Sequence, residues 1–487
     1  MRTKPIVGLV MVLLAATAGL VFAGISTWDF VQHLDRQVHD LHCSFIPGGK
    51  SGGESGCHVA MMSTYSSVFR TSVWGGIPIA LPAMSVFAFI GFYAIDLMIT
   101  RRKTDPRATA FLALATLLPA LTSIAMLVIS LSQLGTTCKL CVGIYISSAI
   151  ALIGAVILWR GAVAARAIGE PIALRKKPTR ERGSDDPAFT STGGAVEPVE
   201  RAKPRLVAVV DAPVASNGFL GAMFATGVAF VVIPVILYFG LAPDHARFIG
   251  TCGALVKPAD VYATEGGKGV MLHVGATGGS AKAIEILDPL CPACRAFEQR
   301  LAKSGIAGDL DRKAVLFPLD NTCNWMVTEA THPGACTVSE AMLCANENAQ
   351  EVLDWAFLEQ DRIREETKVD PTAAARLVKA KFPQYAACVG SPEVKARLNK
   401  SLRWSVANNI RVLTPQLFVE GVKLCDEDVD LGLEYTLTKL LERHRNKTLV
   451  TTPLEAPLPT ADADKPADKS SNKTDKPADK PKPADKA

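Results

Sequence analysis

Two pairs of cysteines give this chain its clearest capacity for chemistry. Cys138 and Cys141 are separated by Lys-Leu, and Cys291 and Cys294 are separated by Pro-Ala. Two thiols at positions i and i+3 of a helix start can close a small disulfide, and the positive end of the helix dipole favours the thiolate of the first cysteine. The two Cys-x-x-Cys sequences therefore predict two centres of thiol–disulfide exchange.

Zinc coordination is the alternative use of a Cys-x-x-Cys sequence. A zinc ribbon needs a second ligand pair, commonly about 15–20 residues away. No such pair accompanies Cys138 and Cys141 at that spacing. The residues that flank Cys291 and Cys294 favour a redox site as well, and we expect no metal at either pair.

The residues around Cys291 predict an exchange site built on a strand and a helix. Residues 282–288 alternate in polarity and are apolar enough for a strand, whereas residues 295–301 have helical spacing. Pro292 suits the first helical turn, where a missing N–H removes no hydrogen bond. We expect Cys291 to be exposed at the helix start with a lowered pKa, and Cys294 to be hidden behind it.

Five long apolar runs are the elements that must position these thiols. About 20 helical residues are needed to cross a hydrocarbon layer of ~30 Å. A mean hydropathy of +0.22 in a chain of 487 residues with 20% charged residues indicates apolar blocks among polar ones. We expect membrane spans over residues 6–25, 77–100, 109–133, 142–159 and 219–241.

The first apolar run has a second interpretation, a cleaved signal peptide. Arg2 and Lys4 precede the run, and residues 21–23 could pass as a cleavage site. The run is longer than the roughly 7–15 apolar residues of a signal peptide, so we expect a retained span. Lys and Arg cluster after the second and fourth runs, which places these loops and the N-terminus in the cytoplasm.

On that topology all twelve cysteines fall on the outer side or at its membrane edge, which fits an oxidising compartment. Cys43 and Cys57 flank a Gly-rich loop at residues 47–56, and they could form either a structural disulfide or a reactive pair. The remaining six should be structural, although the sequence does not choose among their pairings: Cys252, Cys323, Cys336, Cys344, Cys388 and Cys425.

Two polar segments carry no periodic apolar pattern. Residues 163–216 are rich in Pro, Gly, Ser and charge, and residues 451–487 repeat Lys-Pro-Ala-Asp-Lys. Such compositions cannot bury a core, so we expect a flexible cytoplasmic linker and a disordered tail. A net charge of +5 is too mild to indicate a nucleic-acid partner.

The order of the N-terminal features resembles the vitamin K epoxide reductase family. A first span precedes a cysteine pair on an outer loop, and Ser63 follows six residues after Cys57. Gly-Ile-Pro at residues 76–78 opens the next span, and a Cys-x-x-Cys stands at the fourth. The resemblance covers about residues 5–160, and the chain lacks the Asn that is common after Pro78.

The resemblance implies a four-helix bundle that holds a quinone, ubiquinone or menaquinone, between its outer ends. Cys141 would face the quinone, and Cys138 would be its exchange partner. Cys43 and Cys57 would relay electrons inward from a soluble protein. Ser63 would position the loop or half-helix above the pocket.

A second resemblance concerns the C-terminal part. Residues 412–421 resemble the Thr-Pro segment of thioredoxin-fold proteins, in which a cis proline, here Pro415, faces the active thiol. The resemblance covers about residues 282–443. It is closest to the disulfide-forming branch with an inserted helical subdomain, here roughly residues 321–409.

The expected fold is an all-α transmembrane four-helix bundle, a fifth transmembrane helix and an α/β thioredoxin-fold domain with a helical insertion. We expect the thioredoxin-fold domain in the periplasm of a bacterial inner membrane. The expected boundaries are residues 1–162 for the bundle, 163–216 for the linker, 217–242 for the fifth helix, 243–450 for the soluble domain and 451–487 for the tail.

The expected function is a quinone-dependent thiol oxidase that forms disulfides in exported proteins. Electrons would pass from Cys291 and Cys294 through Cys57 and Cys43 to the membrane pair, with reduced client proteins, the bilayer and the attached thioredoxin-like domain as partners. Reduction of vitamin K epoxide, disulfide isomerisation and a membrane-tethered chaperone are the alternatives. The missing Asn and the attached thiol domain disfavour the epoxide.

Overall fold

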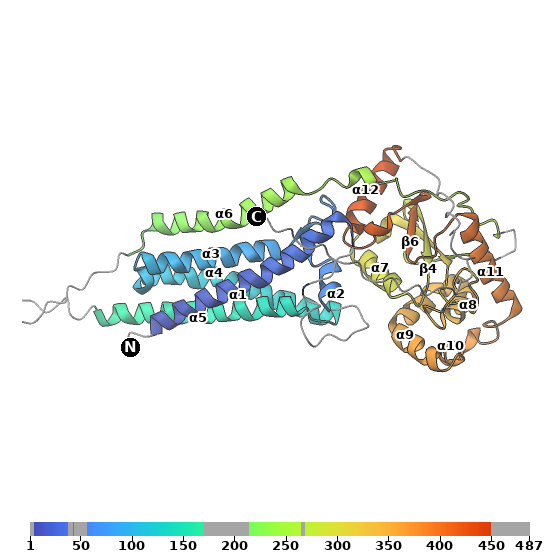
Figure 1. The fold of residues 1–487 in the computed structure, drawn as a ribbon, viewed down its shortest axis with the longest axis horizontal. Coiled ribbons are helices and arrows are strands. Elements are labelled where there is room, and N and C mark those ends of the chain that lie inside the picture. Colours follow the sequence, from blue (N-terminus) through green and yellow to red (C-terminus); the bar gives the residue numbers. More distant parts are fainter. Residues whose placement is uncertain (1–3, 38–41, 43–55, 170–213, 264–267, 450–487) are drawn as a thin grey trace, which may run out of the picture.

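The structure is a computed structural model that describes residues 4–37, 42, 56–169, 214–263 and 268–449. It consists of an elongated helical part and an α/β part attached to one end of it (Figure 1). The expected tail and most of the expected linker lie outside the described residues.

Within the described ranges, five helices are long and apolar enough to cross a membrane. Several begin or end beyond the apolar runs, because polar residues at the ends continue the helical hydrogen bonding. The first runs past the expected residue 25, and the fourth continues into the expected linker. Their bounds are α1 Lys4–Gln32, α3 Ala80–Ile99, α4 Pro106–Ile129, α5 Lys139–Gly169 and α6 Asn217–Leu241.

The four-helix bundle is closed by the contact of α1 with α5. A Cβ atom on Gly8 would lie 2.6 Å from the carbonyl oxygen of Gly154, so the two backbones approach too closely for any side chain there. The fifth helix, α6, lies along α3 (Figure 1). Phe219 and Phe230 of α6 pack against the buried cluster that contains Tyr93 of α3.

The second membrane helix begins three residues later than the sequence pattern suggests. Ile77–Pro78 forms a short strand, β2, which pairs antiparallel with β1, Ser67–Val68. Gly75 and Gly76 both have positive φ and form the turn into β2. The helix α3 therefore starts only at Ala80, on a hairpin that leads from the short helix α2, Gly56–Met62.

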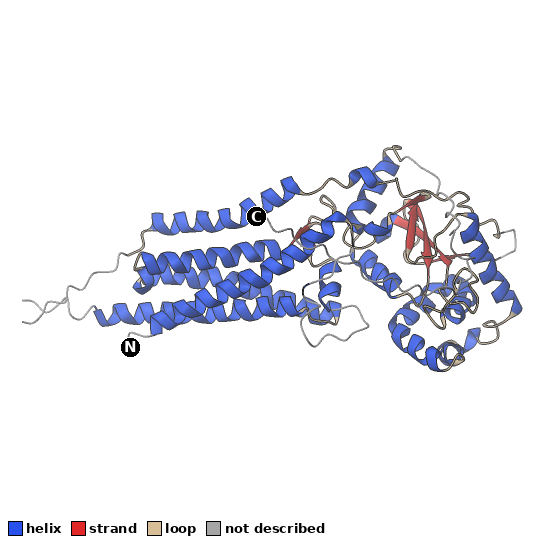
Figure 2. Ribbon diagram, viewed as in Figure 1, coloured by secondary structure: helices blue, strands red, loops and turns tan. Residues whose placement is uncertain are grey.

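A five-stranded mixed sheet forms the centre of the α/β part (Figure 2). The strand order is β3-β5-β4-β6-β7, in which β4 and β5 are parallel and every other neighbouring pair is antiparallel. The strands are β3 Met271–His273, β4 Ala281–Leu287, β5 Leu310–Leu316, β6 Gln416–Val419 and β7 Val422–Lys423.

Helices cover both sides of this sheet, which makes the C-terminal part a thioredoxin-type α/β domain. The crossover helix α7, Pro292–Lys303, connects β4 to β5, and α12, Leu433–Arg445, follows β7. Four helices are inserted between β5 and β6 in the region expected to hold a helical subdomain: α8 Ala335–Ala345, α9 Ala349–Val369, α10 Ala373–Lys381 and α11 Pro392–Ala407.

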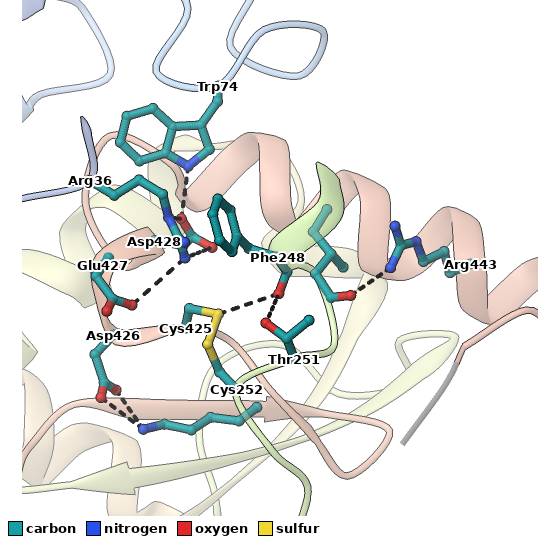
Figure 3. The surroundings of a disulfide bond; sticks show 12 residues. Arg36, Trp74, Phe248, Thr251, Cys252, Cys425, Asp426, Glu427, Asp428 and Arg443 are labelled. Atoms are coloured by element: carbon teal, nitrogen blue, oxygen red, sulfur yellow. Dashed lines mark hydrogen bonds and ion pairs between the residues drawn. A yellow bond between two sulfur atoms is a disulfide. The ribbon is translucent and has the colours of Figure 1, made fainter. Parts of the chain in front are cut away.

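All six cysteines expected to be structural form disulfides. Cys323 pairs with Cys336, and Cys344 pairs with Cys388 within the insertion. Cys252 pairs with Cys425 and ties the segment after α6 to the loop after β7 (Figure 3). These are the pairings that the sequence left open.

Hydrogen bonds and apolar contacts join the helical bundle to the soluble domain. Arg36, just after α1, donates two hydrogen bonds to the Asp428 carboxylate at 3.1 and 3.2 Å, and the Trp74 indole N–H donates to the same carboxylate at 2.8 Å (Figure 3). Phe30 and Leu34 of the bundle share one buried cluster with the soluble domain. The soluble domain is therefore docked on the end of the bundle.

Candidate functional site

The membrane-side thiols lie at the start of α5. Cys138 immediately precedes the helix and is buried, and Cys141 is half-buried in its first turn; both thiols are free. The Cys141 backbone N–H donates to the Cys138 sulfur at 3.4 Å. A hydrogen bond with Cys141 holds the pKa of Cys138 below its ordinary value, while burial and the negative charge of Asp29 act in the opposite sense.

Cys57 lies beside this pair, on the short helix α2. It belongs to one buried cluster with Cys138, and Cys141 packs against the same cluster. A Cβ on Gly56 would lie 2.5 Å from the Thr137 carbonyl oxygen, so glycine allows α2 to approach the residues before Cys138. Cys57 is disulfide-bonded. Cys43 lies outside the described residues, so its pairing with Cys57 stays a prediction.

A cavity of about 80 Å³ opens between these three cysteines. Its walls come from α1, the α2–β2 region, the end of α4 and the start of α5, and they combine apolar side chains with a few polar ones. Beside Cys57, Cys138 and Cys141, the lining residues include Asp29, Tyr65, Met61, Met126 and Tyr145.

Ser63 lies at the end of α2, where it fixes the local backbone. Its hydroxyl donates to the Ala60 carbonyl at 2.7 Å, and its own carbonyl accepts from the Arg70 guanidinium at 2.7 Å. The side chain borders both the small cavity and a larger cleft toward the soluble domain. The positioning role that the resemblance implies for Ser63 stays a prediction.

The soluble thiol pair lies where β4 leads into α7. Cys291 occupies the N-cap of α7, Pro292 follows as its first residue, and Cys294 is completely buried. The Cys291 sulfur lies 3.5 Å from the Thr414 carbonyl oxygen, and the Thr414–Pro415 peptide bond is cis. The structure thus brings Pro415 to the thiol pair, although the two are far apart in sequence.

The expectation of an exposed Cys291 is wrong. Only 4% of the residue is accessible, because the turn before α7 and the Thr414 segment enclose it. Its reactivity is nevertheless favoured, since a hydrogen bond with Cys294 lowers the pKa of the Cys291 thiol to about 6 against the effect of burial. Burial, together with the Cys291 charge, raises the pKa of Cys294 well above its ordinary value.

Sequence reasoning missed a group of charges beneath the thiol pair. Arg312 of β5 donates to Glu285 of β4 at 2.8 Å and to both oxygens of Glu298 on α7. Burial, reinforced by the neighbouring Glu298, raises the pKa of Glu285 well above its ordinary value. The one available signal was a glutamate between two isoleucines in a buried strand.

A second missed pair holds the turn that carries Cys291. Asp288 is completely buried and accepts hydrogen bonds from the Leu290 and Leu319 N–H groups, both at 2.8 Å. His332 Nδ1 lies 2.6 Å from the same carboxylate. Asp288 thereby links the turn before Cys291 to the Leu319 backbone and to His332.

A cleft of about 830 Å³ lies between the two parts of the molecule, and it is lined by residues next to Cys57 and Cys291 rather than by the cysteines themselves. His58 and Ser63 line it from α2 and the loop that follows, whereas Pro292 and Arg295 line it from α7. In Figure 1, α2 lies at the end of the bundle next to α7. The arrangement directs the start of α7 toward the helix that carries Cys57.

Comparisons with known proteins found the following similarities. Two solved structures are similar to part of this chain. The oxidoreductase NmDsbA1 from N. meningitidis matches with 17% identity and a TM-score of 0.26, over 36% of this chain and 92% of that chain. The oxidoreductase DsbA from Xylella fastidiosa matches with 19% identity and a TM-score of 0.25, over 38% of this chain and 99% of that chain. No curated protein matches the chain.

A family model gives the more specific result. Residues 10–156 match the Vitamin K epoxide reductase family, and the matched range includes most of α1, all of α3 and α4, and Cys57, Cys138 and Cys141. The match and the two thiol pairs indicate an oxidoreductase that acts on thiols and disulfides. Residues 10–156 are therefore similar to the Vitamin K epoxide reductase family, and they are joined to a domain with the thioredoxin-type sheet described above.

Proposed function

We propose that this protein is a quinone-dependent thiol oxidase that forms disulfides in exported proteins. The observation that carries the proposal is the meeting of Cys57, Cys138 and Cys141 at one cavity. At the same end of the bundle, residues next to Cys57 and residues next to Cys291 line one cleft. Both thiol centres then belong to one path, along which electrons pass from the soluble pair to the membrane pair.

The proposed path consists of successive thiol–disulfide exchanges. A client dithiol attacks the Cys291–Cys294 disulfide, and the client leaves oxidised while both cysteines become thiols. Cys291 then attacks the disulfide of Cys57, and the pair formed with Cys43 passes two electrons to Cys138 and Cys141. Each exchange breaks one S–S bond and forms another through a mixed disulfide. The low pKa of Cys291 supplies the attacking thiolate near neutral pH.

The residues around the cavity suit a quinone head group. Apolar walls would contact the ring, and Tyr65 and Tyr145, which line the cavity, would offer hydroxyls to its oxygens. The bound quinone would accept the two electrons of the final dithiol. The volume of about 80 Å³ is roughly half of the ~150 Å³ that holds a benzene ring. Binding therefore requires the cavity to widen, for which the flexible side chains of Met61 and Met126 are suited.

We also propose that both thiol centres lie on the outer face of a bacterial inner membrane. The basic residues Arg101, Arg102 and Lys103 lie between α3 and α4, at the opposite end of the bundle from Cys138. The positive-inside rule assigns that end to the cytoplasm. The soluble domain then lies in the periplasm, where its three structural disulfides are stable.

The first experiment tests the overall reaction. Purified full-length protein in detergent should reduce a short-chain ubiquinone analogue while it oxidises a reduced peptide, with one quinone consumed per disulfide formed. Cys141→Ala should abolish quinone reduction. Ser147→Ala, on the same helix, is the matched control and should retain it. Quinone reduction that persists without Cys141 would contradict the proposal.

The second experiment tests the relay between the two parts. Cys294→Ala combined with Cys43→Ala leaves Cys291 and Cys57 without their resolving partners, so their mixed disulfide should accumulate. With a protease site added within residues 170–213, the two cleaved fragments should stay linked on a denaturing gel without reductant and should separate on the same gel after reduction. Fragments that separate without reductant would refute the proposed path.

A further inference from the structure

A buried carboxylate lies on the wall of the thiol cavity and has no part in the exchange reactions described above. Asp29 is in the last turns of α1, is 3% accessible, and lines the cavity together with Cys138 and Cys141. Its charge acts directly on Cys138 and opposes formation of that thiolate. A buried carboxylate is costly unless it has a hydrogen-bonding partner, so its position beside a redox thiol requires an explanation.

The partner of Asp29 connects it to solvent. The backbone N–H of His42 donates to one carboxylate oxygen at 3.2 Å, and His42 Nδ1 lies 2.5 Å from the other. The His42 side chain is 55% exposed, whereas that of Asp29 is 3% exposed. The pair thus forms a short hydrogen-bonded route from water to the inside of the cavity.

We propose that Asp29 and His42 are the proton-transfer pair of the membrane thiol centre. They take up the proton of the Cys138 thiol when it becomes a thiolate, and they deliver a proton to the acceptor in the cavity. The inference rests on the proposed quinone-dependent function. It adds to that function the identity of the groups that move the proton.

The step balances with respect to atoms and electrons. Two S–H bonds of Cys138 and Cys141 are broken, one S–S bond forms between them, and two electrons and two protons pass to the quinone, which becomes a quinol. Cys141 faces the acceptor in the proposed path, so its proton has a direct route. The proton of Cys138 has to leave before the Cys138 thiolate attacks the Cys141 sulfur to form the S–S bond, and the Asp29–His42 pair holds that proton in the interval.

Other ionisable side chains also face the cavity, and the experiments have to separate them from this pair. Cys57 is held in a disulfide and does not titrate there. Among the described residues that line the cavity, the other ionisable groups are Asp29 on α1, Tyr65 after α2, and Cys138, Cys141 and Tyr145 at the start of α5.

One test needs no quinone. In full-length protein carrying Cys141→Ala, the rate of Cys138 alkylation by iodoacetamide is measured against pH. Adding Asp29→Asn removes a negative charge near the thiol, so the midpoint should move to lower pH. Asp35→Asn, in the short helix His33–Asp35 and outside the cavity lining, is the matched control and should leave it unchanged. An unchanged midpoint with Asp29→Asn would overturn the inference.

A second test follows proton transfer during turnover. Asp29→Asn should lower kcat for quinone reduction about 100-fold, as expected for loss of a general acid–base group, whereas Asp29→Glu should recover part of it. His42→Ala should also be slow, and imidazole added to the buffer should restore most of the rate because the His42 position is exposed. Full activity of Asp29→Asn, or failure of imidazole to rescue His42→Ala, would refute the assignment.

These outcomes separate the two proposals. Wild-type protein that oxidises peptide without reducing quinone would refute the proposed function, whatever the variants do. Wild-type protein that reduces quinone, together with an equally active Asp29→Asn variant, would refute only the role of the pair. The thermal unfolding midpoint of each variant, compared with that of the native protein, checks that the variant is folded.

Discussion

At the scale of single residues, the soluble site depends on an unequal pair of thiols. Cys294 is completely buried, which disfavours its charged form, and it hydrogen-bonds to Cys291, whose charged form is thereby favoured. When a disulfide is attacked, a cysteine with a stabilised thiolate leaves more readily, and the reduced pair is more stable than an ordinary dithiol. The pair is therefore suited to give its disulfide to other proteins.

This asymmetry predicts the pH dependence of Cys291 in the reduced protein. Its pKa of about 6 is below the ordinary value of about 8.5. The thiolate therefore stabilises the reduced folded state fully above about pH 8.5, and this contribution is lost as the pH falls through about 6. Alkylation of Cys291 measured against pH should have a midpoint near 6, and Cys294→Ala should raise it. A midpoint near 8.5 in the native sequence would contradict the prediction.

The buried charges beneath the thiols predict a large effect of removing their one cation. Arg312 is 5% exposed and contacts both Glu285 and Glu298. Arg312→Met should destabilise the soluble domain by about 3–5 kcal/mol, because two carboxyl groups then lose their buried partner. Denaturant unfolding measures this. Arg362→Ala, which removes a surface ion pair on α9, should change the midpoint very little, and equal effects of the two variants would argue against the burial argument.

At the scale of elements, the docking of the two parts depends on one close approach. A Cβ on Gly432, at the start of α12, would lie 2.3 Å from the Trp74 indole nitrogen, which donates to Asp428. The short helix Asp426–Asp428 follows Cys425, so the Cys252–Cys425 disulfide supports the acceptor of this hydrogen bond (Figure 3). Glycine at position 432 is therefore needed for the contact.

We predict that Gly432→Ala displaces Trp74 and weakens docking. A hydrogen bond to a charged group contributes about 1.5–3 kcal/mol, so transfer of electrons from the soluble pair to Cys57 should slow by roughly tenfold or more. Trapping the redox state of Cys291 at short times after addition of a client measures this step. Gly308→Ala, where an added Cβ meets no atom within 4 Å, is the control. Equal transfer rates in the two variants would show that the contact does not position the domains.

The elements also show what the sequence could and could not predict. Apolar runs of the length of a bilayer and two Cys-x-x-Cys spacings are local patterns, so the spans and both thiol pairs were found directly. The β1–β2 hairpin was missed because Ile77 and Pro78 continue an apolar run. Arg36 and Asp428 are 392 positions apart, and neither Arg312 nor Asp29 belongs to a motif, so their roles become visible only in the folded chain.

At the scale of the whole molecule, the soluble domain is held in two ways. One is covalent, through α6 and the segment before it. The other is the interface of Arg36, Trp74 and Asp428 with its shared apolar cluster. A flexible tether alone provides an effective concentration of about the millimolar range, whereas a built interface keeps the start of α7 at the cleft beside α2.

The two contributions can be separated by cutting the chain. After cleavage at a protease site within residues 170–213, α6 and the soluble domain should stay bound to the bundle, because α6 packs along α3 and Asp428 still accepts from Arg36 and Trp74. The fragments should co-elute in size-exclusion chromatography under reducing conditions, and peptide-dependent quinone reduction should survive dilution. Asp428→Ala removes the acceptor of three hydrogen bonds and should make the cut protein, but not the intact one, lose activity on dilution. If the cleaved protein without the Asp428→Ala substitution also loses activity on dilution, the covalent tether holds the domains together and the interface does not.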